Sequence, residues 1–456
     1  MAPVSTDLRL LTGDTAGELM TAVLAPNGGR LLTWAPRQVD HRPGRRTTVS
    51  YSARVRWSDG SVTDETLGAS SGTLPDGVVR LTDGTTEIGM WRFPFDPDLP
   101  ALAAACDPER MRRLAADVGL TGGGPGPDGA GPDGAGPDGA GPDGAGPDGA
   151  GTGGPGPGGS GPGGTGPGGT EPGGTGPGGT GAGDIRLTIR AYRPRRRAVV
   201  EVRTPGGTVF VKVVRPAGAR ALHERHRAAL AAGCPVPAPL GWTDDGLVAL
   251  AALPGRTLRE LLTGAGPVEL NVDEVVDLLD ALPAEWAAGD PRRTWGQRAP
   301  HYAEVIAAAA PELADRARAI ADAVAHDAPE GPTGATHGDF YETQLMVGAG
   351  GVSGLLDIDT AGHGERLDDA GCLLAHLSVL AQLHPDRADT INPLGLRLQR
   401  RFARDLDPAA MARRAAAVTL SLATGPHRVQ ERHWPASTTR RIALAERWLD
   451  HAARCA

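Results

Sequence analysis

The chain has 456 residues, a formal net charge of −8 and 40% hydrophobic residues, which leaves room for two or three domains with sizeable cores. Basic residues do not outnumber acidic ones, 46 against 54, so the composition indicates no basic face for nucleic acid. No stretch approaches the ~20 uncharged apolar residues that span a bilayer, and the N-terminus has no signal-peptide pattern. We therefore expect a cytoplasmic protein without a nucleic-acid or membrane partner.

Residues 1–120 are predicted to form an α+β unit. The stretch TTVSYSARVRW alternates in the manner of a β-strand and is followed by the turn SDG. Further on, DPERMRRLAADVG has helical spacing, with Asp107 and Pro108 as a helix start signal. We interpret this unit as a cap, or as an extension of the β-rich lobe that follows.

Residues 121–183 form a low-complexity segment of P-D-G-A-G repeats and P-G-G-T units, which holds 32 of the 67 glycines. The segment has no Leu, Val, Ile or aromatic residue, so it cannot bury enough apolar area to offset the entropy of ordering. A collagen-like triple helix is excluded because the glycines of the repeats alternate at spacings of three and two. We expect a disordered linker.

Residues 184–253 are predicted to form a small antiparallel β-rich lobe. The segments IRLTIRAY, AVVEVRT and TVFVKVV have strand patterns with short turns between them, and a helical segment ending at Gly233 follows. Lys212, the only lysine of the chain, lies on the third strand. It either contacts nucleotide phosphates, where a compact ammonium is not replaceable by Arg, or extends into solvent from a strand edge.

Two weaker signals accompany these strands. Glu224 is the only acidic residue of the following helix and is a candidate to hold Lys212 in place, with an ordinary exposed helix charge as the alternative. The stretches HRPGRRTTVSY (41–51) and YRPRRRAVVEV (192–202) share R-P-x-R-R before a strand. This similarity indicates either a decayed duplication or shared strand-edge chemistry. Residues 195–197 are expected to face solvent, with phosphate contact as the alternative.

Residues 254–456 are predicted to be mostly helical, interrupted by THGDFYETQLMV (336–347) and VSGLLDIDTAG (352–362). Strands in these two stretches would pair as a hairpin and bring Asp339, Gln344 and Asp357 to one end of a site. Carboxylate and amide oxygens suit Mg²⁺. Phosphoryl transfer also needs a carboxylate that orients the attacking hydroxyl, which is the role predicted for Asp339. His337 is expected to brace the loop by hydrogen bonds.

In order and spacing, these motifs resemble the aminoglycoside phosphotransferase and choline kinase-like family over about residues 185–456. The family pattern is H-G-D-x-x-x-x-N, then hydrophobic-D-hydrophobic, G-(D/E) and a further Asp. The matching residues here are His337, Gly338, Asp339, Gln344, Asp357, Gly364, Glu365 and Asp369. Gln344 replaces the Asn, as in maltokinase-like relatives, which also carry an N-terminal cap. A Gly-rich phosphate loop is missing from the first hairpin turn, YRPRRRA.

The resemblance implies an α+β, bilobal protein-kinase-like fold, with a small antiparallel β-rich N-lobe before a large helical C-lobe. It implies ATP and Mg²⁺ as cofactors and a hydroxyl of a small molecule as acceptor. The roles it implies are catalytic base for Asp339, metal ligands for Gln344 and Asp357, ATP phosphate contact for Lys212, a tie to the loop for Asp369, and adenine binding by the backbone of Ala251 to Leu253. The alternative is an inactive pseudokinase that binds a nucleotide or a partner.

The motifs do not identify the acceptor. Glu365 and Asp368, near the expected pocket, either receive a cationic substrate or are ordinary charges at a helix start. An aminoglycoside-, amino alcohol- or sugar-like acceptor is compatible with the pattern.

Overall fold

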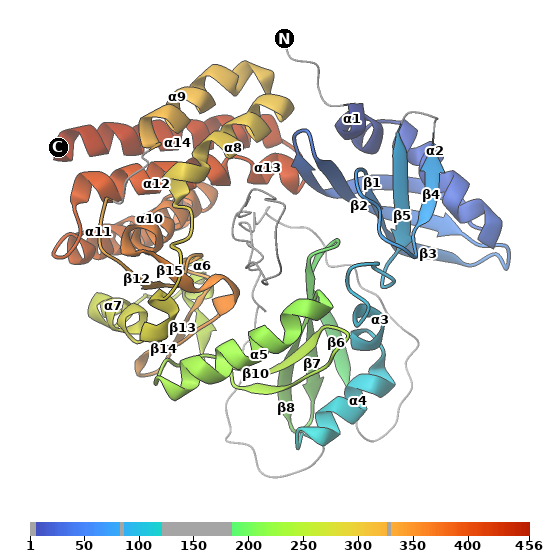
Figure 1. Cartoon of the computed structure of the whole chain (residues 1–456), viewed down its shortest axis with the longest axis horizontal. Coiled ribbons are helices and arrows are strands. Elements are labelled where there is room, and N and C mark those ends of the chain that lie inside the picture. The colour runs from blue at the N-terminus through green and yellow to red at the C-terminus, as the bar shows by residue number, and fades with distance from the viewer. Residues whose placement is uncertain (1–5, 83–85, 121–184, 326–329) are drawn as a thin grey trace.

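The structure is a computed structural model that describes residues 6–82, 86–120, 185–325 and 330–456. The predicted disordered linker lies outside the described residues. Two five-stranded antiparallel sheets precede a mostly helical lobe (Figure 1). The predicted α+β class, with a β-rich lobe before a large helical lobe, is confirmed.

The N-terminal unit is a five-stranded sheet covered by two helices. Leu11 and Met20 of the helices pack on Tyr51 and Met90 of the sheet, and all four are fully or almost fully buried. The predicted strand TTVSYSARVRW lies within the second strand and the residue that follows it. The elements are α1 (Thr6–Thr12), α2 (Thr15–Leu24), β1 (Arg30–Arg42), β2 (Arg46–Arg56), β3 (Val62–Ser70), β4 (Val79–Thr82) and β5 (Glu87–Arg92).

Two short helices, α3 (Leu102–Ala105) and α4 (Pro108–Asp117), follow this sheet. The second begins where predicted, because the Asp107 carboxylate accepts hydrogen bonds from the backbone N–H groups of Glu109 (2.8 Å) and Arg110 (3.0 Å). Apolar side chains of both helices share a core with the second sheet, among them Leu102, Met111, Val200 and Val211. The N-terminal unit is therefore packed onto the sheet of the β-rich lobe.

The second sheet contains the predicted three-strand meander at its start. Its strands are β6 (Arg186–Arg193), β7 (Arg197–Thr204), β8 (Gly207–Val214), β9 (Pro239–Trp242) and β10 (Leu247–Ala251), and α5 (Pro216–Ala231) lies between the third and the fourth. Strand β8 is central, between β7 and β10. Lys212 therefore comes from the middle of the sheet.

The two sheets share strand order and register. In each, the order across the sheet is first, second, third, fifth, fourth strand. One row of paired residues crosses each sheet, and the rows correspond: Asp40, Thr48, Ser70, Gly89 and Arg80 in the first, Ala191, Val199, Lys212, Val248 and Trp242 in the second. Ser70 thus has the register position that Lys212 has in the second sheet.

The two R-P-x-R-R stretches form the same hairpin turn. Arg42 pairs with Arg46 in one, and Arg193 with Arg197 in the other. The third turn residue is left-handed in both, Gly44 with φ 71° and Arg195 with φ 63°. Together with the common register, this favours the duplication over shared strand-edge chemistry alone. The N-terminal sheet has the same strand order and register as the sheet of the β-rich lobe.

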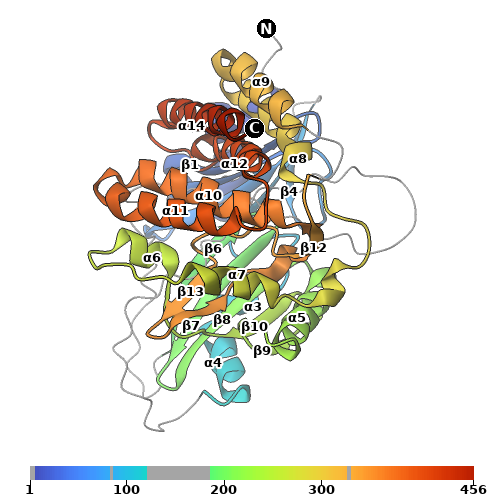
Figure 2. The same cartoon turned by 90° about the vertical axis from the view of Figure 1, so that its left-hand side faces the viewer.

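The helical lobe surrounds two small sheets and has two apolar cores. Its helices α8 to α10, α12 and α14 pack together on the side away from the second sheet (Figures 1 and 2). None of the described helices is long and apolar enough to cross a membrane. The elements are β11 (Arg256–Thr257), α6 (Leu258–Thr263), α7 (Val272–Asp280), α8 (Trp295–Ala309), α9 (Ala314–Val324), β12 (Thr333–Thr336), β13 (Leu345–Gly348), β14 (Gly351–Leu355), β15 (Gly362–Glu365), α10 (Arg366–Leu383), α11 (Ala388–Phe402), α12 (Pro408–Leu422), α13 (Gly425–Arg428) and α14 (Trp434–Cys455).

A buried carboxylate joins the N-terminal unit to the second sheet. Asp96 accepts hydrogen bonds from the Tyr192 hydroxyl (2.8 Å) and from the backbone N–H of Arg195 (2.7 Å). The Arg195 guanidinium continues the contact, donating to the Ser70 hydroxyl (3.0 Å) and lying 3.0 Å from Asp98. The turn of the second hairpin is therefore anchored on the first sheet.

We expect Asp96→Ala to lower the free energy of unfolding by roughly 2–4 kcal/mol, because two buried donors lose their acceptor. Chemical denaturation of the full chain measures this. Asp64→Ala, on the exposed face of β3, is the matched control and is expected to change stability by less than about 0.5 kcal/mol. Equal effects of the two substitutions would contradict the anchoring role of Asp96.

Candidate active site

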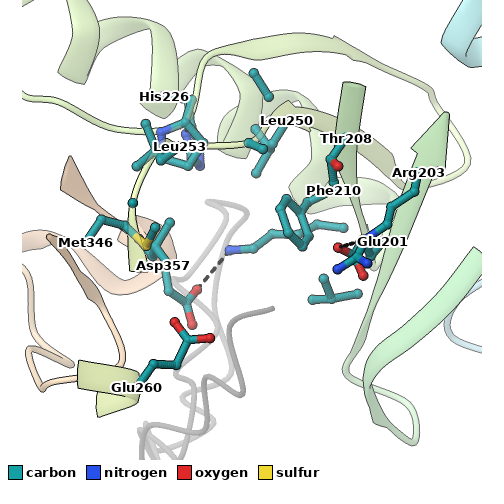
Figure 3. A pocket seen from close by; sticks show the side chains of 17 residues that line it. Glu201, Arg203, Thr208, Phe210, His226, Leu250, Leu253, Glu260, Met346 and Asp357 are labelled. Carbon is teal, nitrogen blue, oxygen red and sulfur yellow. Dashed lines mark hydrogen bonds and ion pairs between the residues drawn. The ribbon is translucent and has the colours of Figure 1, made fainter. Parts of the chain in front are cut away.

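A cavity of about 270 Å³ lies between the second sheet and the β13–β14 hairpin (Figure 3). The sheet contributes Val199, Phe210 and Leu250, and the hairpin side contributes Met346 and Leu356. This apolar pair of walls suits a flat aromatic group. Ala251 and Leu253, whose backbone is expected to bind adenine, line the same cavity, together with Lys212 and Asp357.

Lys212 reaches from the second sheet to two carboxylates of the helical lobe. Its side chain is 4% exposed, and its Nζ lies 2.9 Å from Oδ1 of Asp357 and 2.7 Å from Oδ1 of Asp359. Because β8 is central, the alternative of a lysine reaching solvent from a strand edge does not apply. The ammonium and both carboxylates meet where strand β14 has just ended.

Asp357 is held by two cations. The guanidinium of Arg197 lies 3.1 Å from each of its carboxylate oxygens, in addition to the contact with Lys212. Burial opposes ionisation of Asp357, but the charges of Arg197 and Lys212 outweigh it and hold the pKa well below its usual range. Asp357 has a left-handed backbone, with φ 54°, which turns the chain away from β14 directly after the strand.

Asp339 is buried, with 1% of its surface exposed. Both of its carboxylate oxygens lack a hydrogen-bond partner among the described residues. Burial and the charge of Asp357 raise its pKa to about 8, although Arg197 and Arg193 act in the opposite direction. An unsatisfied carboxyl group of this kind is poised to accept a hydrogen bond or a proton from a ligand.

The loop that carries Asp339 is braced on both sides. The backbone N–H groups of His337 (2.9 Å) and Gly338 (2.6 Å) donate to the Asp369 carboxylate. The backbone N–H of Asp339 donates to Nδ1 of His337 (3.2 Å), so Nε2 carries the hydrogen and donates to the Leu356 carbonyl (2.8 Å). Burial lowers the pKa of His337, which keeps the imidazole neutral in this role.

Gln344 lies at the end of the same loop and is fully buried. Its backbone is fixed, since its N–H donates to the Tyr341 carbonyl (2.9 Å) and its carbonyl accepts from Leu356 (2.8 Å). The side-chain oxygen and nitrogen of Gln344 have no hydrogen-bond partner within the described part of the chain. A buried amide without partners fits a ligand position.

Glu224 does not pair with Lys212, which differs from the expectation. Its carboxylate binds Arg220 at 2.8 Å and is 55% exposed. The buried residues of α5 include Leu222 and His226, and Glu224 lies between them in sequence, on the opposite face of the helix. Asp359, together with Asp357, supplies the partner that Glu224 was expected to be.

Other charges near the site are also buried and paired. Arg195 and Arg197 are each 7% exposed, so the expectation that they face solvent is wrong. Glu365 and Asp368 lie 2.8 Å and 3.0 Å from Arg414. Both carboxylates are buried and share the Arg414 guanidinium with Glu330, so neither is an ordinary exposed charge at a helix start.

Arg197 and Asp359 take part in the ion cluster around Lys212 and Asp357, although the sequence patterns did not assign them to it. Asp359 follows Asp357 by two residues, a signal that was visible in the D-I-D motif. Arg197 is one of several arginines at a hairpin tip, and nothing in their pattern separates it from its neighbours. Only the pairing of β6 with β7 shows which arginine reaches the carboxylates.

Residues 189–402 match the model of the family described as "Phosphotransferase enzyme family". The match covers 214 of the 456 residues, and its phosphotransferase description agrees with the site described above. The protein is accordingly a small-molecule phosphotransferase. A search of curated proteins finds no match.

Several solved structures are similar to this chain at low identity. The aminoglycoside phosphotransferase APH(4)-Ia, as a thermostable mutant, is 15% identical, with a TM-score of 0.39 over 59% of this chain and 94% of that one. A macrolide 2'-phosphotransferase from Brachybacterium faecium is 20% identical, with a TM-score of 0.32 over 57% and 91%. Choline kinase from Cryptosporidium parvum is 10% identical, with a TM-score of 0.39 over 58% and 88%.

The raised pKa of Asp339 predicts a pH-dependent stability change. A carboxyl group whose folded-state pKa lies above its unfolded value costs the fold stability progressively as pH rises from the unfolded-state pKa to the folded-state pKa, and the cost is constant above that. For Asp339 the folded-state pKa is about 8, so part of the cost is already present at pH 6 and the full cost is reached by pH 9. Asp339→Asn removes the ionisation. We expect its Tm to exceed that of the wild type at pH 9 and to be closer to it at pH 6.

Thermal unfolding of both proteins across this range measures the effect. Asp64→Asn, on the exposed face of β3, is the control and should leave the pH dependence of Tm unchanged. A difference between Asp339→Asn and wild type that is constant from pH 6 to pH 9 would contradict the assignment.

Proposed function

We propose that this protein is an ATP- and Mg²⁺-dependent kinase that transfers the γ-phosphate to a hydroxyl group of a small molecule. The observation that carries the proposal is the buried carboxyl of Asp339, whose oxygens lack partners among the described residues, beside the Lys212–Asp357 pair (2.9 Å). Phosphoryl transfer needs a cation for phosphate, oxygen ligands for a metal and a carboxylate for the acceptor hydroxyl. These three residues have the corresponding chemistry.

The nucleotide base would occupy the cavity between the second sheet and the β13–β14 hairpin. Leu250 and Met346 line opposite walls, and the aromatic ring of Phe210 also faces inward. The backbone N–H of Ala251 already donates to the Ala238 carbonyl at 2.8 Å. Base contacts are therefore assigned to the other backbone groups between Ala251 and Leu253.

Asp357 and Gln344 would hold Mg²⁺. The donor set fits because Asp357 stays ionised and the amide of Gln344 has no partner within the described residues. A magnesium ion at this position would neutralise charge on the nucleotide phosphates. Gln344 keeps the amide oxygen of the family's Asn on a side chain that is one methylene longer.

The chain's own residues then have separate tasks. Lys212 holds its ammonium beside Asp357 (2.9 Å), where it can bind phosphate oxygens. Asp339 accepts the proton of the acceptor hydroxyl, for which its raised pKa of about 8 makes it a stronger base than an ordinary carboxylate. His337 and Asp369 keep the loop in place through the hydrogen bonds described above. A cytoplasmic location is part of this proposal, since ATP is abundant there.

One observation favours a second candidate, a nucleotide-binding pseudokinase. Arg197 contacts both carboxylate oxygens of Asp357, at 3.1 Å each, and so competes with a metal for this ligand. Catalysis requires the guanidinium of Arg197 to leave Asp357 when the nucleotide binds. The two candidates differ in whether phosphate is transferred.

Purified protein with Mg-ATP and a panel of hydroxyl acceptors should release ADP in the presence of at least one of them. The panel spans aminoglycosides, sugars, amino alcohols, and phosphorylated or carboxylated alcohols. Asp339→Asn should lower kcat by about 100-fold or more, as expected for loss of a catalytic base, while Asp244→Asn on an exposed turn should not. If ATP raises Tm but no acceptor is phosphorylated, the pseudokinase candidate is correct.

Gln344 should act through the metal. Gln344→Leu, which keeps the approximate size and removes the oxygen, is expected to raise the Mg²⁺ concentration for half-maximal activity by about 10-fold or more. Gln344→Glu keeps an oxygen ligand and should stay within a few-fold of wild type. The measurement is a Mg²⁺ titration of initial rates at fixed ATP. An unchanged Mg²⁺ requirement in the leucine variant would exclude Gln344 as a ligand.

A further inference from the structure

The two R-P-x-R-R hairpin tips and helix α13 bring arginines together next to Asp339. In Figure 1 the β1–β2 tip lies beside α13, and the β6–β7 tip points toward the same region. Helix α13 packs against β1. The first tip provides Arg42 and Arg46, the second provides Arg196, and α13 provides Arg428. We call these four residues the arginine cluster.

Burial and the neighbouring positive charges lower the pKa of two arginines of the cluster, Arg196 and Arg46. Burial, partly offset by Asp40 and reinforced by Arg42, lowers the pKa of Arg196 to about 9. The pKa of Arg46 is also lowered, first by burial and then by Arg42. The facing carboxylate is Asp40, whose pKa is lowered by all four arginines against the effect of burial. All four arginines therefore act on this one carboxylate.

Two members of the arginine cluster make no direct ion pair in the described part of the chain, although Asp40 raises the pKa of both. Neither Arg46 nor Arg428 forms an ion pair or a side-chain hydrogen bond there, and the Nε of each is buried without a partner. Other buried arginines are matched, as Arg195 is by Asp98 and Arg414 by Asp368. A partly buried guanidinium without a carboxylate is costly unless an anion completes its environment.

The cluster borders the proposed catalytic base. The negative charge of Asp339 is among the influences that raise the pKa of Arg428, against the larger effect of burial. The pKa of Tyr302, raised to about 12 mainly by burial, also responds to Asp339, Arg196 and Arg428. The second tip reaches the candidate site directly, because Arg197, next to Arg196 in the chain, lies 3.1 Å from Asp357.

We propose that the arginine cluster binds an oxyanion group of the acceptor, so that the substrate is a hydroxyl compound that already carries a phosphate or a carboxylate. This inference rests on the proposed kinase function and adds the acceptor's charge class. Guanidinium groups pair with both kinds of oxyanion through charge-assisted hydrogen bonds. Arg46 comes from the N-terminal sheet, so this unit completes the acceptor site. The substrate class is opposite in charge to an aminoglycoside.

Matched acceptor pairs test the charge class. ADP release with Mg-ATP is measured for glycerol 3-phosphate against glycerol, glucose 6-phosphate against glucose, and glycerate against 1,2-propanediol, with ethanolamine and kanamycin as cationic acceptors. We expect anionic members to have a kcat/KM at least about 10-fold above their neutral partners. The phosphate and carboxylate pairs show which oxyanion is preferred. Preferred turnover of a neutral or cationic acceptor overturns the proposal.

Substitutions of single arginines test whether the preference for anionic acceptors depends on the arginine cluster. Arg46→Gln and Arg428→Gln should raise KM for the best anionic acceptor by about 10- to 100-fold, with KM for ATP and kcat changed less than about 3-fold. The matched controls are Arg54→Gln on the exposed side of β2 and Arg432→Gln just after α13. They should leave all three constants unchanged. Equal effects of cluster and control variants overturn the proposal.

A binding measurement separates this inference from the kinase function itself. Inorganic phosphate, without nucleotide, should raise Tm of the wild type, and Arg46→Gln and Arg428→Gln should abolish that shift while retaining the shift caused by Mg-ATP. If no acceptor is phosphorylated but the phosphate shift depends on both arginines, the kinase function fails and the anion site stands. If phosphate gives the same shift in wild type and both variants, the anion site fails whatever the activity.

Discussion

The buried ion cluster of Lys212, Arg197, Asp357 and Asp359 joins the β-rich lobe to the helical lobe. Its cations come from neighbouring strands of the second sheet, and its carboxylates from the loop after β14. Charges with so little exposure are stable only together, because removal of one partner of a buried pair costs about 3–5 kcal/mol. The same contacts that fix the two lobes relative to each other therefore also place the groups that would meet a nucleotide and a metal.

The N-terminal unit resembles the second sheet in its backbone but lacks the lysine of that sheet. It repeats the strand order and register of the second sheet, but Ser70 stands at the position of Lys212. A serine cannot supply a cation for phosphate, so the first copy is not a second nucleotide site. Its hairpin tip instead lies beside α13, and its Ser70 hydroxyl accepts a hydrogen bond from Arg195 (3.0 Å). The unit is hydrogen-bonded to the lobe whose strand order it shares.

Most groups of the candidate site could be named from the sequence because they lie in short motifs. The H-G-D stretch and the later D-I-D stretch each follow or end an apolar strand, and strand patterns are local properties. Residue identity also helped, since a single lysine among 45 arginines is visible without any structure. Glu224 failed as a prediction because its helical face was not fixed by the sequence around it. The pairing of Arg197 depended on strand register, and no count of arginines contains that information.

The sequence by itself determined which chemical groups the protein has, the order of its β-rich and helical parts, and that residues 121–183 are too polar and glycine-rich to form a core. Only the tertiary structure decided which charges meet. It buried Arg195 and Arg197, which composition alone assigns to solvent, and it paired Glu365 and Asp368 with Arg414. It also brought two arginine-rich turns, 151 positions apart between Arg42 and Arg193, to one region beside Asp339. The reason is physical: electrostatic partners are set by distance and burial in space, and neither is a local property of the chain.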